Sequence, residues 1–252
     1  MSGHSKWKTI QHKKGAADAK RGKVFSKLSK ELAVVAKRGG SNPDLNPALR
    51  ALIQKAKSSN MPADNVDRAI KKGAGELEGT TYEEITYEGY ASGGVAMIVQ
   101  VLTDNKNRAA AEIRHTFTKH GSSFAGPGSV SRGFVRKGQI FVDASTVDED
   151  RLMTLVLDAG AEDMQKDADG QFEILTDPAA FADVMEALEK AGIKTEGGEV
   201  SMVPLNYVPV TEKSIASGVM RFVQELEDKD DVQNVYTNMD VDAAVLQELE
   251  KG

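Results

Sequence analysis

The chain has 252 residues, of which 40% are hydrophobic and 28% charged, as in an ordinary globular protein with room for two or three domains. It contains no cysteine, which excludes disulfides, thiolate metal sites and a cysteine nucleophile. No apolar run approaches the roughly 20 residues that span a bilayer, and no apolar segment follows the basic N-terminus, so the sequence predicts a cytoplasmic protein without a membrane partner.

The charge is divided unevenly along the chain. Residues 1–75 hold 17 Lys and Arg against five Asp and Glu, a net charge of +12, although the whole chain carries −6. The rest of the chain is therefore strongly acidic. Opposite charges on two halves favour a polyanionic partner, either nucleic acid or an acidic membrane. The alternative is a basic surface that is only solvated, or that docks on the acidic half.

The basic segment predicts an N-terminal arm followed by three helices. Residues 1 to about 15 lack hydrophobic periodicity and predict an arm. The first helix, expected over 16–38, ends at two glycines. Its predicted core face carries Val24, Leu28, Leu32 and Val35. The opposite face carries Lys23, Lys27, Lys30 and Lys37.

Two shorter helices complete the predicted bundle. Asn46 as the cap and Pro47 in the first turn begin the second helix. The third follows Pro62 and stops at Gly73. Both have amphipathic spacing, so the three helices predict a small bundle with its own core.

From about residue 80 the pattern changes to strands alternating with helices. Strands are expected over 84–90 and 95–103, and a helix with Ala110, Ile113 and Phe117 inward is expected over 107–120. Later elements are expected over these ranges: strands 129–135, 139–142, 162–166, 171–175, 199–203 and 232–237, and helices 147–158, 179–191 and 212–226.

This order predicts an α+β fold of three domains: an N-terminal three-helix domain followed by two ferredoxin-like α/β domains, the third inserted into the second. The first sheet is still short of strands when the chain leaves it, which is the reason for the insertion. The expected boundaries are 1–78 for the basic helical domain, 79–135 plus 207–252 for the second domain, and 136–206 for the inserted one.

No catalytic, cofactor or metal site is predicted. The segment GSSFAGPG at 121–128 has the first two glycines of a phosphate-binding loop, but Pro127 and Gly128 replace its Lys and Ser/Thr, so we expect a turn. His115 and His120 lie five residues apart on a predicted helix and turn away from each other. The acidic residues form surface runs rather than a pair that the sequence singles out.

Nucleic-acid binding is the chemistry that the basic segment favours. Lys and Arg bind phosphate oxygens without reading sequence. Trp7, the only tryptophan, offers a ring on which an unstacked base sits, or else anchors the arm on the bundle. The predicted binding residues are Lys6, Trp7, Lys8, Lys13, Lys14, Lys20, Arg21, Lys23, Lys27, Lys30, Arg68, Lys71 and Lys72.

Several stretches resemble the YebC family of probable transcriptional regulatory proteins, whose mitochondrial relatives are described as translational activators. They are GHSKW at 3–7, KK at 13–14, NMP at 60–62, DNVDRAIKKG at 64–73, YEGY at 87–90 and TDNKNR at 103–108. The resemblance implies three domains with a helical N-terminal one, and nucleic-acid binding without catalysis. The family often has Gly-Pro before GGVA, where this chain has Ala91 and Ser92.

Two functions are consistent with these observations. The first is a DNA-binding regulator of transcription, which the family's label favours. The second is a translation factor that binds structured RNA and associates with the ribosome. The three helices lack a clear helix-turn-helix spacing, and the charge of the arm suits either polymer.

Overall fold

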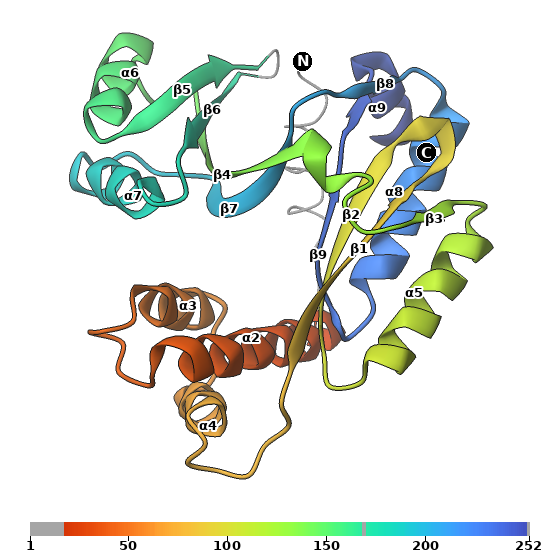
Figure 1. The fold of residues 1–252 in the computed structure, drawn as a ribbon. Coiled ribbons are helices and arrows are strands. Elements are labelled where there is room, and N and C mark those ends of the chain that lie inside the picture. Colours follow the sequence, from red (N-terminus) through yellow and green to blue (C-terminus); the bar gives the residue numbers. More distant parts are fainter. Residues whose placement is uncertain (1–17, 168–169, 251–252) are drawn as a thin grey trace.

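The computed structural model describes residues 18–167 and 170–250, arranged as a helical bundle, two four-stranded β-sheets and a two-stranded sheet (Figure 1). The bundle contains α2 (Asp18–Gly39), α3 (Pro47–Ser58) and α4 (Ala63–Gly73). The Asn46 side chain accepts a hydrogen bond from the Leu49 N–H at the start of α3, as the cap signal predicts. Leu28, Leu32, Leu49 and Val66 form the bundle's core.

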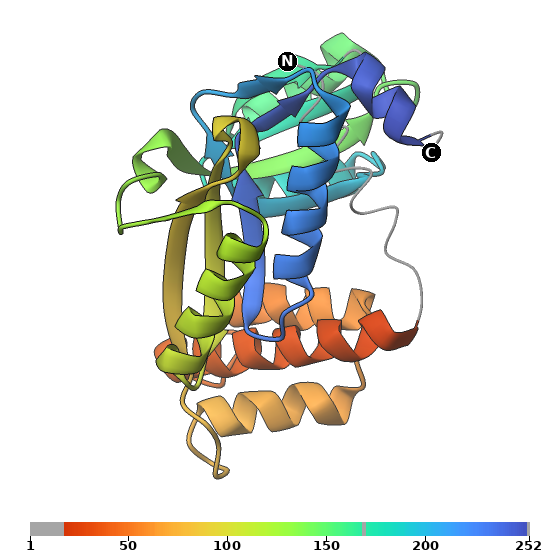
Figure 2. The same ribbon diagram turned by 90° about the vertical axis from the view of Figure 1, so that its right-hand side faces the viewer.

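The first sheet has the strand order β3-β1-β2-β9 and is antiparallel throughout. Its strands are β1 (Glu83–Tyr90), β2 (Ala96–Thr103), β3 (Ser123–Ala125) and β9 (Val232–Thr237). Helices α5 (Lys106–Lys119) and α8 (Lys213–Glu227) cover one face (Figure 2). On that face the rings of Phe117 and Phe222 pack edge to face, with their centroids 4.9 Å apart. Beside this sheet, β8 (Val208–Val210) pairs in parallel with β10 (Met239–Val241), and α9 (Ala243–Glu250) follows.

The residues of the second sheet are inserted in the sequence between β3 and β9 of the first sheet. The second sheet contains β4 (Phe134–Asp143), β5 (Ala161–Lys166), β6 (Gln171–Thr176) and β7 (Gly197–Pro204), in the order β5-β6-β4-β7. Helices α6 (Glu149–Asp158) and α7 (Phe181–Lys190) pack on it around Ile140, Leu152 and Phe172. This is the ferredoxin-like order β-α-β-β-α-β. The first sheet differs from that order because it begins with the β1–β2 hairpin. The fold class α+β is confirmed.

Two local expectations are corrected. The strands expected at 129–135 and 139–142 are one strand, β4, which begins after a short 3-10 turn at Ser131–Gly133. A Cβ at Gly138 would lie 2.2 Å from the Thr176 hydroxyl oxygen, so this glycine permits close packing rather than ending a strand. The segment expected as a turn contains β3, which pairs with β1.

One expected core residue in each of two helices also differs from expectation. Val24 is 41% exposed and is not a core residue. In α5 Ala109 is buried, whereas the expected Ala110 is only partly so. In α2 the neighbouring Phe25, rather than Val24, packs against the bundle core.

Candidate nucleic-acid interface

Helix α4 presents three exposed cations, Arg68, Lys71 and Lys72. They follow from the amphipathic pattern that buries Val66 and Ala69 on the opposite side. Within the described part of the chain, none of the three makes an ion pair or a side-chain hydrogen bond. Their charge is therefore available to an anion in solution.

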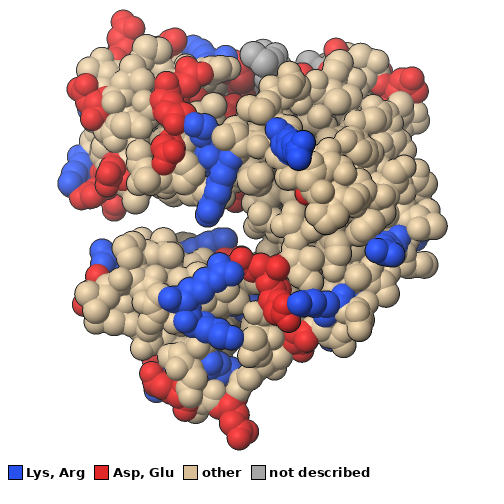
Figure 3. All heavy atoms as spheres, viewed as in Figure 1, with Lys and Arg blue, Asp and Glu red and all other residues tan. Residues whose placement is uncertain are grey.

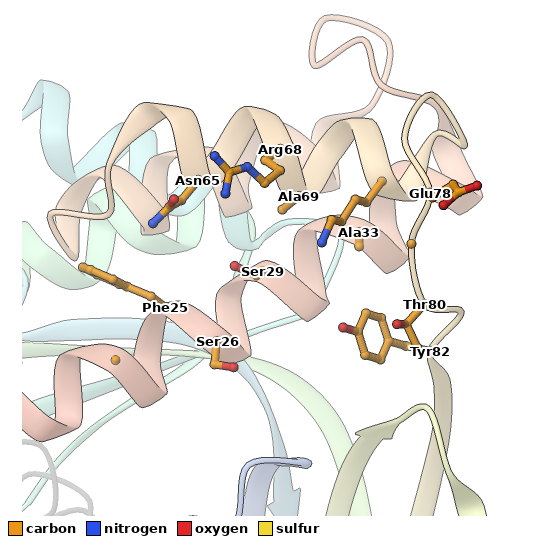
Figure 4. Close-up of a pocket in the computed structure, with 13 residues that line it drawn as sticks. Phe25, Ser26, Ser29, Ala33, Asn65, Arg68, Ala69, Glu78, Thr80 and Tyr82 are labelled. Atoms are coloured by element: carbon orange, nitrogen blue, oxygen red, sulfur yellow. The ribbon is translucent and has the colours of Figure 1, made fainter.

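A groove of about 950 Å³ runs between α2, α4 and the linker that leads to β1 (Figure 4). Arg68 and Lys72 line it from α4, Ser26 and Ser29 from α2, and Tyr82 from the linker. Its other lining residues are Gly22, Phe25, Ala33, Asn65, Ala69, Glu78, Gly79 and Thr80. In size it matches the clefts that hold small ligands.

Close backbone packing shapes this groove. A Cβ at Gly73 would lie 2.2 Å from the Ala33 carbonyl oxygen, so α2 and α4 approach closely at that end. A Cβ at Gly79 would lie 3.1–3.4 Å from the Lys72 side-chain carbons, so the linker passes directly over the stem of that lysine. The glycine thus allows the linker to restrict the directions that the Lys72 ammonium can take.

Tyr82 places an aromatic ring at the linker end of the groove (Figure 4). The Lys30 ammonium lies 5.8 Å from the centre of the ring. Burial, followed by the negative charges of Asp104 and Asp231, raises the pKa of the Tyr82 hydroxyl above its ordinary value. The hydroxyl therefore stays protonated at neutral pH.

The lysines of α2 have a different environment, because they contact the C-terminal end of α8. The Lys23 Nζ donates to the Asp228 carbonyl oxygen at 3.0 Å and its carboxylate at 3.2 Å, and the Lys27 Nζ donates to the Glu227 carbonyl oxygen at 2.9 Å. The Lys30 Nζ donates to the Asp230 carbonyl oxygen at 2.9 Å. Spacings of four and three place these lysines on one face of α2, where they satisfy carbonyls at a helix end that favours positive charge.

Asp231 is the centre of this contact, which we call the α2–α8 joint. Its carboxylate accepts from the Lys30 Nζ at 2.6 Å, from the Arg108 guanidinium at 2.7 Å and from the Thr103 hydroxyl at 2.8 Å. Burial opposes ionisation of Asp231, but these donors outweigh it and lower its pKa. Burial also lowers the pKa of Lys27, despite the nearby Glu227 and Asp228 charges. The joint is thus an ion-pair network between the basic bundle and the acidic part of the chain.

The predicted binding residues therefore fall into separate groups. Arg68 and Lys72 share the groove, with Lys71 beside them on α4. Lys23, Lys27 and Lys30 lie in the α2–α8 joint, which is the docking alternative that the charge pattern left open. Lys6, Trp7, Lys8, Lys13 and Lys14 lie outside the described residues, and the side chains of Lys20 and Arg21 are not described either.

The surface view shows where the charges lie. Figure 3 shows Lys and Arg side chains gathered on the bundle, with acidic side chains beside them toward the first sheet. The surface is hollowed between the bundle and the lobe that contains the second sheet. No sequence pattern indicated Tyr82, Ser26 or Ser29 as groove residues, since a linker aromatic and two helix serines have no periodic signal. The only available sign was their position beside the basic helices.

The described residues hold no group of His, Asp or Glu side chains arranged to bind a metal ion. Across the same residues, no helix is both long enough and apolar enough to cross a membrane. The Gly-rich loop also has its own partner. The Glu88 carboxylate accepts from the N–H groups of Gly128 at 2.9 Å, Val130 at 2.6 Å and Ser131 at 3.0 Å. Those donors are used within the fold.

Together, the fold and the groove define a class of α+β protein in which a basic helical bundle is joined to a sheet that carries an inserted ferredoxin-like sheet. The family model described as TACO1/YebC protein N-terminal domain matches residues 5–76, and the model described as TACO1/YebC second and third domain matches residues 82–239. The chain belongs to the TACO1/YebC family.

Relatives and a solved structure agree with this assignment. A probable transcriptional regulatory protein of Desulfatibacillum aliphaticivorans is 57% identical over 96% of this chain and 97% of its own. A probable transcriptional regulatory protein of Geobacter sulfurreducens is 54% identical over 99% of this chain and 100% of its own. The crystal structure of a conserved hypothetical protein from Aquifex aeolicus is similar with a TM-score of 0.79 and 46% identity, and covers 89% of this chain and 92% of the other.

Proposed function

We propose that this chain is a non-enzymatic, cytoplasmic, nucleic-acid-binding regulator of gene expression, with DNA as its target and transcription as the regulated step. The observation that carries the proposal is that Arg68 and Lys72 in the groove, and Lys71 beside them on α4, have no ion-pair or side-chain hydrogen-bond partner among the described residues. Lys and Arg that lack protein partners release counterions when they meet phosphates, which drives binding. The names of the relatives support a role in transcription.

The N-terminal arm extends the proposed interface. Lys6, Lys8, Lys13 and Lys14 add positive charge, and Trp7 adds an aromatic ring among them. In this proposal these residues add phosphate contacts to those of α4. Lys23, Lys27 and Lys30 are not part of the interface, because the α2–α8 joint already uses them.

One observation favours a second candidate, an RNA-binding translation factor associated with the ribosome. The Tyr82 ring lines the same groove as Arg68 and Lys72, and a ring stacks on bases only where they are unpaired. Unpaired bases are usual in RNA loops and absent from intact duplex DNA. Treating the nucleic acid that copurifies from cells with DNase or RNase distinguishes the two candidates. Loss after DNase supports the first, and loss after RNase supports the second.

The proposed interface is tested by a pair of single substitutions in the bundle. Arg68→Ala removes a groove cation, and Lys57→Ala removes an exposed cation of α3 that lies outside the groove. We expect Arg68→Ala to weaken binding of labelled nucleic acid and to reduce the slope of log K against log salt by about one, while Lys57→Ala changes both much less. Fluorescence anisotropy across a salt series measures both quantities. Equal effects of the two substitutions would contradict the proposed interface.

A further inference from the structure

We infer that the groove between α2, α4 and the linker binds one unstacked nucleotide of a single strand, with its phosphate at Arg68 and Lys72 and its base against Tyr82. This inference rests on the proposed function and makes it more specific, since it names the form of nucleic acid that the groove accepts. It applies to DNA and RNA alike, because both offer a phosphate and a flat base.

The groove contains the two kinds of group that such a nucleotide needs. Arg68 and Lys72 supply positive charge from one wall, and the linker over the Lys72 stem restricts where its ammonium points. The Tyr82 ring stands at the linker end (Figure 4). A cation and an aromatic ring in one groove are the elements of single-strand sites, where phosphates are paired and bases are stacked.

The rest of the lining suits a polar, flat ligand rather than an apolar one. Ser26, Ser29 and Asn65 offer hydroxyl and amide groups for base edges or sugar hydroxyls. Ala33 and Ala69 also line the groove, and their small side chains take up little of its space. A volume of about 950 Å³ accommodates one nucleotide together with a flanking phosphate.

A duplex does not offer this combination. Its bases are stacked and paired inside, and bringing one out costs a few kcal/mol. Its phosphates still attract Arg68 and Lys72, so a duplex makes the electrostatic part of the contact without the stacking part. The groove therefore gives a preference for single strands, while the free cations of α4 give affinity for both forms.

The test compares a short single-stranded oligonucleotide with the duplex of the same sequence, each as DNA and as RNA, on the full chain. Tyr82→Ala removes the ring, and Tyr82→Phe keeps the ring as a matched control. Ser29→Leu fills the groove without changing any charge, and provides a second variant if Tyr82→Ala unfolds the bundle. Thermal unfolding of each variant establishes that it is folded.

We expect Tyr82→Ala and Ser29→Leu to weaken single-strand binding about tenfold or more, and to leave duplex binding within about twofold. Tyr82→Phe should bind the single strand like the original chain. A 2-aminopurine base in the single strand should lose fluorescence on binding the original chain but not the Tyr82→Ala variant.

Other outcomes separate the inference from the proposed function. If Ser29→Leu and Tyr82→Ala bind single strands as the original chain does, while Arg68→Ala weakens single strands and duplexes equally, the cations are plain phosphate contacts and the inference is wrong. The proposed function survives that result. If the original chain binds neither form at low salt, the proposed function itself fails.

Discussion

The Glu88 carboxylate is almost fully buried, at 4% exposure, between β1 and the loop that leads into the second sheet. A buried charge is stable only where donors surround it, and here three backbone N–H groups of residues 128–131 do so. Burial acts to raise the pKa of Glu88, but these hydrogen bonds outweigh burial and lower it. One side chain thus fixes the loop that connects the two sheets.

Replacing this carboxylate should loosen the loop. Glu88→Gln keeps the shape but presents an amide N–H₂ to a backbone donor and removes the charge, which we expect to cost about 2 kcal/mol locally. Amide hydrogen exchange at Val130 should then become about 30-fold faster at neutral pH. Glu84→Gln is the matched control, because Glu84 lies on the same strand in an exposed ion pair with Arg38.

The effect of Glu88→Gln should also depend on pH. The folded-state pKa of Glu88 is lowered, so its contribution to stability is fully present above the ordinary carboxyl pKa and is lost as pH falls through the folded value. The difference in stability between the original chain and the Glu88→Gln variant should therefore shrink in acid. A difference that grows on acidification would contradict this account of the loop.

At the scale of elements, the α2–α8 joint depends on Asp231. Its side chain and that of Lys30 are 10% and 11% exposed, so removing the Asp231 charge leaves the Lys30 ammonium buried with only the Asp230 carbonyl oxygen to accept from it. We expect Asp231→Asn to destabilise the packing of the bundle on the first sheet by about 3 kcal/mol. The urea unfolding midpoint measures this. Asp230→Asn is the control, since Asp230 is exposed and contributes its carbonyl oxygen rather than its carboxylate.

The helices and strands could largely be predicted because their signals are local. The cap at Asn46 and the glycines Gly39 and Gly73, at which α2 and α4 end, all lie within a few residues of the feature that they specify. A strand as short as β3 contains too few residues to show a pattern. The sequence divides β4 into two strands because the reason for a glycine at position 138, its close contact with Thr176 and Phe181, lies far along the chain.

The site was predictable only in part for a related reason. The sequence shows that Lys23, Lys27 and Lys30 share a face of the first helix. It does not show which acceptors that face contacts, because the carbonyl oxygens at the end of α8 lie about 200 residues away. Arg68 and Lys72 were predicted from charge alone. Tyr82 joins them only because the linker crosses the bundle between α4 and β1, which no local pattern records.

At the scale of the whole molecule, the charge separation serves two purposes. Part of the positive charge of the bundle holds the acidic end of α8, and part remains free around the groove. The salt dependence of binding reports only the cations that contact phosphates and so release counterions condensed on the nucleic acid. Cations of the two groups should therefore differ in effect, although they lie in the same bundle and carry the same charge.

Two double substitutions that remove the same charge test this difference. Lys71→Ala with Lys72→Ala should reduce the slope of log K against log salt by about two, since each lysine accounts for about 0.9 of the slope. Lys23→Ala with Lys27→Ala should change the slope by less than about 0.5, because these ammonium groups already donate to Asp228 and Glu227. The second pair should instead lower the urea unfolding midpoint, since the joint loses two of its donors.

Equal losses of slope in both double variants would mean that nucleic acid opens the joint and binds the α2 lysines, or that only the overall field of the bundle matters. Either result would contradict the division of the basic surface into a structural and a binding group.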